Sequence, residues 1–342
     1  MACLFGTFCI ATPCIGKPSS GNLATIWRSL RPDFLRCPVF LLWPVFSHCR
    51  VLLLLPMLWL GLLAATGTAA AADPILRSGD SLALVGGTFI ERMQANPWLE
   101  AELQLRRSDW QLRVRNLGWS GDDVHGFARK VFDPNPEKGF QRLQYDLDLA
   151  NPTAVLLAYG FAEASNGGDA VERFEPGLVR LVESQLERQR RVILMRPFVL
   201  PGVRTKGYED SIRACAETVD RVGERFGLPV IGVTCDDFIV DGLVPSERGY
   251  RDIASQLAER LVGGSADAVE AIASTQQGGE LGRLILRKDE LFFHRHRPQN
   301  ETYLLLFRKH EQGNNAVELP QFDPLIDELE SQIWRLAQRP EN

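Results

Sequence analysis

Cysteine, histidine and runs of basic residues are scarce in most of this sequence. Five of the seven cysteines fall within residues 1–72, and only Cys215 and Cys235 lie beyond them. Two cysteines do not make a disulfide framework, and neither has the spacing of a metal ligand. The formal net charge is −5, and the absence of a basic run argues against a nucleic-acid-binding surface. We therefore expect no cofactor, no metal and no nucleic-acid partner.

Residues 1–72 differ in composition from the rest of the chain. Arg50 precedes the apolar run Val51–Ala65, which leads through a run of alanines to Asp73. A charged flank, an apolar stretch and small residues before a polar start are the parts of a secretory signal. We expect a leader that is cleaved near its end, so that the domain is exported to the periplasm or the extracellular space. An uncleaved membrane anchor over residues 51–72 is the alternative, because this segment is uncharged and long enough to span a bilayer.

From residue 81 onward, short apolar runs alternate with longer amphipathic stretches. The apolar runs, which predict strands, are Leu82–Val85, Gln111–Leu117, Thr153–Tyr159, Arg191–Met195 and Pro229–Val233. The amphipathic stretches, which predict helices, are Phe89–Leu105, Phe140–Leu149, Val171–Gln189, Tyr208–Phe226 and Glu247–Leu261. Continuous apolar runs fit strands that are buried on both faces, as in a parallel sheet. The alternation predicts one α/β domain over residues 73–264, with a doubly wound parallel sheet of about five strands between helices.

The composition changes again after residue 264. We expect residues 265–342 to form a helical extension packed on the main domain, with helices over 266–274 and 322–338. Residues 291–315 are dense in histidine, arginine and aromatic side chains. They form either a packed seam against the main domain or a binding site for an anionic or sugar ligand.

In a doubly wound sheet, ligands bind beyond the carboxyl ends of the strands. Four short blocks stand at those ends: Val85-Gly86-Gly87-Thr88, Asn116-Leu117-Gly118-Trp119-Ser120-Gly121-Asp122, Tyr159-Gly160-Phe161-Ala162-Glu163 and Asp241-Gly242-Leu243-Val244-Pro245. This succession resembles the SGNH (GDSL-like) hydrolase family over about residues 75–262. Residues 291–315 resemble a C-terminal extension of some secreted bacterial members. The resemblance implies a flavodoxin-like three-layer fold and ester hydrolysis.

A literal Gly-Asp-Ser occurs at residues 79–81, before the first predicted strand. A serine there would lie at the amino-terminal edge of the sheet, away from the expected site. Gly-Asp is also favourable turn chemistry. We interpret this tripeptide as the turn that leads into the strand, and we expect Ser81 to be dispensable.

The resemblance assigns a role to five positions. Thr88 stands in place of the nucleophilic serine, Gly121 provides a backbone oxyanion donor, and Ala162 stands in place of an oxyanion-binding asparagine. Asp241 is the acid that orients the base, and Val244 stands in place of the histidine base itself. Valine cannot accept a proton and alanine cannot donate a hydrogen bond. Three of the five positions are therefore substituted.

Two functions remain open on the sequence. The first is an exported, catalytically inactive member of the family. It would bind a glycan, an acyl ester or a protein partner in the cleft where active members bind their substrate. The second is an active esterase or carbohydrate deacetylase that uses Thr88 with His125 or a histidine of the extension. Asn166 is a candidate replacement for the missing amide, although its setting among serine and glycine is typical of a turn. A zinc site of His294, His296 and His310 would require the first two to share one face of a strand.

We predict that the mature protein begins close to Asp73. Amino-terminal sequencing of the exported protein should read from this residue within a few positions, because the alanine run ends there. A protein that fractionates with membranes and still carries residues 51–72 would instead establish the anchor.

Overall fold

The computed structural model describes residues 73–264 and 274–338. The expected leader lies outside these residues, as does all but the last residue of the helix expected over 266–274. None of the described helices is both long enough and apolar enough to cross a bilayer.

Five parallel strands form a single sheet in the order β2-β1-β3-β4-β5. The strands are β1 (Ser81–Gly86), β2 (Arg113–Asn116), β3 (Ala154–Ala158), β4 (Arg191–Met195) and β5 (Val230–Ile231). Every residue of β1 and β3 is buried, because helices cover both faces of the sheet. The predicted doubly wound α/β fold is confirmed. Since all strands are parallel, their carboxyl ends meet at one edge of the sheet.

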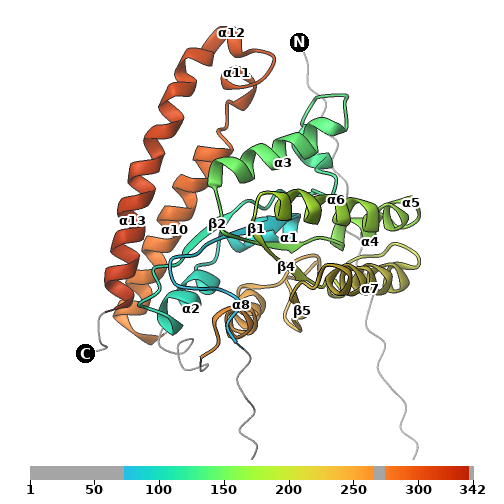
Figure 1. Cartoon of the computed structure of the whole chain (residues 1–342), viewed down its shortest axis with the longest axis horizontal. Coiled ribbons are helices and arrows are strands. Elements are labelled where there is room, and N and C mark those ends of the chain that lie inside the picture. Colours follow the sequence, from blue (N-terminus) through green and yellow to red (C-terminus); the bar gives the residue numbers. More distant parts are fainter. Residues whose placement is uncertain (1–72, 265–273, 339–342) are drawn as a thin grey trace, which may run out of the picture. The chain divides into compact units, whose positions relative to one another are not determined.

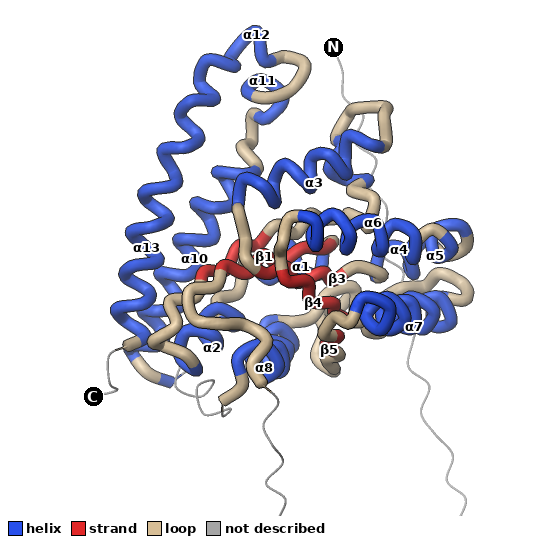
Figure 2. The backbone as a smooth tube through the Cα atoms, in the orientation of Figure 1, coloured by secondary structure: helices blue, strands red, loops and turns tan. Residues whose placement is uncertain are grey.

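Helices form a layer on each side of the sheet (Figures 1 and 2). On one side, α3 (Glu137–Ala150) pairs with α6 (Phe174–Glu187), joined by a hydrogen bond from Gln185 to Gln144, and α7 (Tyr208–Phe226) packs against α6. On the other side, α2 (Trp98–Arg106) packs against α8 (Glu247–Val262). Short helical turns follow the strand ends: α1 (Thr88–Met93), η1 (Phe127–Lys130), α4 (Phe161–Asn166) and α5 (Asp169–Glu172).

The single helix predicted over Phe89–Leu105 is wrong. The chain forms α1 and α2, separated by a turn that ends at Pro97. Proline restricts the residue before it to extended conformations and cannot donate the next helical hydrogen bond. The interruption affects the pocket described below, because the direction of α1 after β1 is then independent of the direction of α2.

The extension forms a helical pair beside the edge strand β2. α10 (Gln276–His296) packs against β2 and α2, and α13 (Phe322–Ala337) packs along α10 (Figure 1). Three short elements connect the pair: α11 (Glu301–Leu304), α12 (Lys309–Gln312) and η2 (Gly313–Gln321). The pair therefore covers the side of the sheet that β2 would otherwise expose.

A buried lysine joins the extension to the main domain. Lys288 of α10 has no exposed surface. Its ammonium lies 2.5 Å from the carboxylate of Glu100 in α2 and 2.6 Å from that of Asp289, and it donates to the Val114 carbonyl of β2 at 3.1 Å. Arg115 of β2 pairs with Glu330 of α13 close by. Buried charges are tolerated only when they are paired in this way.

Replacing Lys288 with methionine should lower the free energy of unfolding by about 3–5 kcal/mol, because it leaves two carboxylates without their cation. Arg287→Met is the matched control, since the Arg287 side chain is 57% exposed. That variant should stay within about 0.5 kcal/mol of the parent. Urea unfolding measures both. Equal stability of Lys288→Met and the parent would contradict a stabilising role for the cluster.

Candidate ligand pocket

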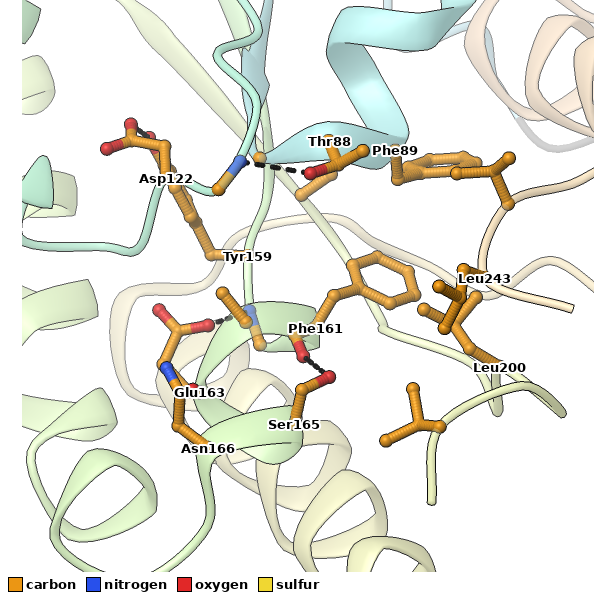
Figure 3. Close-up of a pocket in the computed structure, with 17 residues that line it drawn as sticks. Thr88, Phe89, Asp122, Tyr159, Phe161, Glu163, Ser165, Asn166, Leu200 and Leu243 are labelled. Carbon is orange, nitrogen blue, oxygen red and sulfur yellow. Dashed lines mark hydrogen bonds between the residues drawn. The ribbon is translucent and has the colours of Figure 1, made fainter. Parts of the chain in front are cut away.

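A pocket of about 340 Å³ opens at the carboxyl ends of the strands. Residues that follow β1, β2 and β3 line it, together with residues from the loops after β4 and β5. Figure 3 shows its two sides. The apolar side chains of Phe161, Leu200 and Leu243 lie on one side, and the polar groups of Asp122, Tyr159 and Glu163 lie on the other.

Thr88 and Gly121 meet in this pocket, as the family resemblance implies. Thr88 is the first residue of α1, and its hydroxyl oxygen accepts a hydrogen bond from the Gly121 N–H at 3.0 Å. Gly121 adopts a positive φ of 73°, which a glycine reaches without strain. The Thr88 oxygen thus lies beside a backbone donor of the second block.

The glycines of the first two blocks allow this meeting. A Cβ on Gly118 would lie 2.3 Å from the Glu91 nitrogen of α1, and a Cβ on Gly87 would lie 2.8 Å from the Asp122 carbonyl oxygen. Asn116 fastens the same junction, because its side chain donates to the Ile90 carbonyl at 2.7 Å and accepts from the Gly118 N–H at 2.9 Å. Close backbone contacts and hydrogen bonds at this junction therefore explain the Asn-x-Gly start of the second block.

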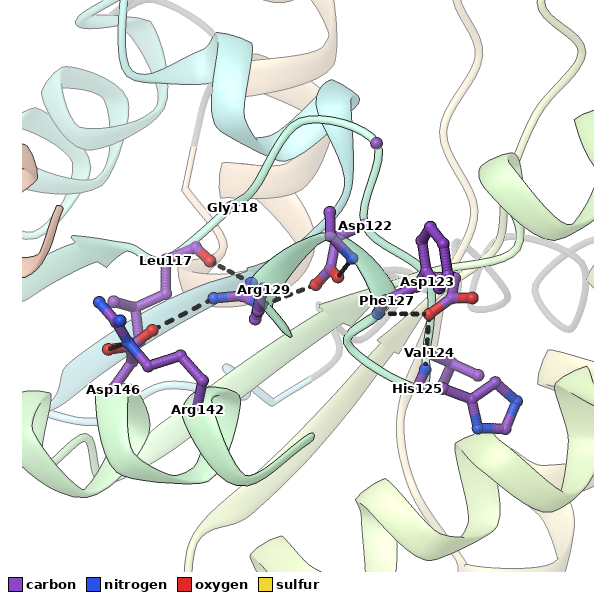
Figure 4. Close-up of polar contacts among 12 residues, drawn as sticks. Leu117, Gly118, Asp122, Asp123, Val124, His125, Phe127, Arg129, Arg142 and Asp146 are labelled. Carbon is purple, nitrogen blue, oxygen red and sulfur yellow. Dashed lines mark hydrogen bonds and ion pairs between the residues drawn. The ribbon is translucent and has the colours of Figure 1, made fainter. Parts of the chain in front are cut away.

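The carboxylate of Asp122 takes part in a buried ion pair (Figure 4). Its carboxylate accepts from Arg129 Nε at 2.7 Å and from the Tyr159 hydroxyl at 3.3 Å. Arg129 also donates to the Leu117 carbonyl at 2.7 Å. Burial raises the pKa of Asp122, and the neighbouring guanidinium opposes that shift. The network fixes the loop between β2 and η1.

Glu163 is a lining residue that the sequence interpretation did not single out as functional. Its carboxylate accepts from the Gly160 N–H at 2.9 Å and from the Val124 N–H at 2.8 Å, which joins the third block to the second. No salt bridge pairs it with a cation in the described part of the chain. Burial raises its pKa to about 7. A glutamate three residues after a glycine at a strand end is a capping signal that could have indicated this position.

Ala162 and Val244, which stand where the resemblance implies an asparagine and a histidine, both line the pocket. Asp241 does not, which corrects the expectation that it borders the cleft. Its carboxylate turns back to accept the Leu243 N–H at 2.9 Å, and the residue is exposed. The same turn packs against the loop after β4, where the Gly202 N–H donates to the Gly242 carbonyl at 2.9 Å.

Among the residues that the structure describes, no histidine lines the pocket. The His125 ring lies against Gly177 of α6, where a Cβ would come within 2.7 Å of it, and it points away from the Asp122 network (Figure 4). His294 and His296 end helix α10 rather than alternating on a strand, so they do not share a face. Within residues 73–264 and 274–338, no three histidine, cysteine or acidic side chains are grouped to hold a metal.

Ser81 lies at the opposite edge of the sheet from the pocket. It is the first residue of β1, and its N–H donates to the Thr153 hydroxyl at 3.0 Å. Gly79, with a φ of 79°, makes the turn before it. Asp80 accepts from the Thr153 hydroxyl at 2.7 Å and pairs with Arg191. The Gly-Asp-Ser tripeptide therefore stabilises the amino-terminal edge of the sheet through hydrogen bonds and an ion pair.

Asn166 lies at the end of α4 on the outer part of the pocket, and it is exposed. The next residue, Gly167, has a φ of 65°. The segment is thus the helix end and turn that its serine and glycine neighbours indicated, and it also contributes to the pocket wall.

Several solved structures are similar to this chain. A gut microbial diltiazem-metabolizing enzyme matches 78% of this chain and 97% of its own, at 11% identity and a TM-score of 0.56. An acetylxylan esterase from Geobacillus stearothermophilus matches 55% and 96%, at 17% identity and a TM-score of 0.45. An alpha/beta hydrolase from the metagenome of Lake Arreo, Spain, matches 55% and 98%, at 18% identity and a TM-score of 0.44.

No family model matches the sequence, and no curated protein matches it. At such low identities the structural likeness concerns the fold alone. The chain has a three-layer α/β fold, which by itself does not determine an activity.

The buried carboxyl of Glu163 should make stability depend on pH. Its folded-state pKa of about 7 lies above the usual 4.5, so the folded protein retains a proton that the unfolded chain releases. This contribution is fully present below pH 4.5 and is lost as the pH rises through 7, a change of roughly 3 kcal/mol. Glu163→Gln should flatten the unfolding free energy over that interval by about this amount. Glu172→Gln, at an exposed position in α5, should leave the pH profile unchanged. An unaltered slope in Glu163→Gln would contradict the assignment.

Proposed function

We propose that this protein is an exported, non-catalytic member of the SGNH hydrolase type, which binds an ester-like ligand in its pocket without hydrolysing it. One observation carries the proposal. The pocket keeps the Thr88–Gly121 contact, but alanine and valine occupy the positions of the amide donor and the base, and no histidine lines it.

Ester hydrolysis of this type requires a base to remove the proton of the attacking hydroxyl. Val244 cannot do so, and Asp241 turns away into its own loop. Removing a triad base costs about 10⁶ in rate. Removing one oxyanion donor, as at Ala162, costs a further ~10²–10³. A threonine hydroxyl in the remaining half of the site does not compensate for losses of this size.

The shape and chemistry of the pocket support ligand binding. Its volume of about 340 Å³ suits a small molecule. The apolar side formed by Phe161, Leu200 and Leu243 would accept an acyl group, and the Thr88 hydroxyl would face the polar part of the ligand. An acyl ester or an acylated carbohydrate combines these two features.

Active hydrolysis through Thr88 is the alternative, and the hydrogen bond from Gly121 to its oxygen favours it. The base would then have to be a group other than histidine. Glu163 lines the pocket, but backbone N–H groups already occupy both of its oxygens. This weakens the alternative.

We predict that the protein shows no appreciable hydrolysis of short-chain nitrophenyl esters or acetylated sugars. Thr88→Ser alone should change nothing, because no base is present to activate the serine. The triple change Thr88→Ser, Ala162→Asn and Val244→His restores each substituted role, and it is the variant in which turnover should appear if Asp241 can then orient the new histidine.

Thr88→Val tests whether Thr88 acts as a nucleophile with a base other than histidine. It removes the hydroxyl and keeps the β-branched shape, so folding should be retained. Turnover by the parent protein that is lost in Thr88→Val would overturn the non-catalytic proposal and establish Thr88 as a working nucleophile.

A further inference from the structure

The residue after helix α10, an arginine, contacts the loop after β2 and helix α1. Arg297, the residue after α10, places its guanidinium 3.8 Å from the centre of the Trp119 ring. Its Nη1 atom also lies 3.0 Å from the Glu91 carboxylate of α1. Arg297 therefore contacts two elements of the main domain at once, the loop after β2 and the first helix.

These two elements are the ones that bring the pocket groups together. Trp119 and Ser120 immediately precede Gly121, and the Ser120 hydroxyl donates to the same Glu91 carboxylate. Glu91 lies one helical turn after Thr88 on α1. The contact of Arg297 with Trp119 and Glu91 thus spans the junction whose inner side is the Gly121–Thr88 hydrogen bond.

The side chains around Trp119 pack closely against its ring. Trp119 is 8% exposed. Arg129 and Arg142 also approach its ring, at 5.3 and 5.6 Å. Arg142 donates in turn to the His296 carbonyl of α10 at 2.8 Å, so a second arginine beside the tryptophan also contacts the extension. Stacked, partly desolvated guanidinium groups of this kind hold an aromatic ring in a single position.

We propose that Arg297 is a positioning residue, through which the C-terminal extension fixes the loop 119–122 and with it the Gly121 N–H that faces Thr88. This inference rests on the proposed role of the pocket as a ligand site, because that role gives the position of the Gly121 donor its importance. A bound molecule or a displacement that moved the end of α10 would then alter the pocket.

Backbone hydrogen exchange on the full-length chain, followed by mass spectrometry without ligand, tests the proposal. Arg297→Ala should accelerate exchange in peptides that cover residues 117–124 by roughly 3- to 30-fold, the range that a stacked and paired arginine contributes. Peptides from β3 should exchange as in the parent. Arg297→Lys should give an intermediate effect, because it keeps the charge for Glu91 and loses the flat stack on Trp119.

Arg287→Ala is the matched control, since it removes an exposed arginine from the same helix, and it should leave residues 117–124 unchanged. Glu91→Gln is a second variant, which removes the ion pair while keeping the side-chain volume. Its effect and that of Arg297→Ala should combine to less than the product of the two, because they break the same contact.

Two results would overturn the proposal. One is unchanged exchange over residues 117–124 in both Arg297→Ala and Glu91→Gln. The other is equal acceleration in β3, which would mean that Arg297 only holds the extension in place. Ester turnover by the parent protein would refute the non-catalytic function and leave the exchange result standing, so the two failures are distinguishable.

Discussion

The close approach of the first two strand ends is the constraint on which the pocket depends. α1 begins at the end of β1 and runs directly beside the loop after β2, where only glycine fits at positions 87 and 118. Because the backbones touch there, the Thr88 hydroxyl comes within hydrogen-bond distance of the Gly121 N–H. The interruption before α2 at Pro97 is part of the same constraint, since a continuous helix from Phe89 to Leu105 would fix the direction of α1 by the packing of α2.

Paired charges hold the surroundings of that junction in place. Asp122 and Arg129 pair beneath the loop, Glu91 and Arg297 pair outside it, and Lys288 with Glu100 joins the extension to the sheet edge. The Glu91–Arg297 and Lys288–Glu100 pairs connect segments that are far apart in the sequence, and the Asp122–Arg129 pair closes the loop after β2. Burial makes the loss of one partner costly, so these pairs specify one arrangement of the loops and of the extension.

The sheet could be predicted because local signals determine it, and the family resemblance implied that Thr88 and Gly121 lie at one site. Continuous apolar runs identified the strands, and the glycine-containing blocks marked their carboxyl ends. Asp241 was misplaced because a side chain that accepts a hydrogen bond from its own turn leaves no trace in a motif. Lys288 was missed for a different reason: a lysine in an amphipathic helix is expected on the solvent face, and only the tertiary position of Glu100 explains its burial.

The glycine blocks and the substituted positions of this pocket meet different requirements. Gly87, Gly118 and Asn116 are required by backbone contacts and hydrogen bonds that exist without any ligand. The family resemblance gives a histidine at position 244 and an asparagine at position 162 the roles of base and oxyanion donor, which belong to the chemistry of hydrolysis. A protein that lost hydrolysis would therefore keep the glycine pattern and could change the other two positions freely. Under the proposed function the glycine pattern is therefore independent of turnover, and the residues at positions 162 and 244 distinguish a hydrolysing pocket from a binding one.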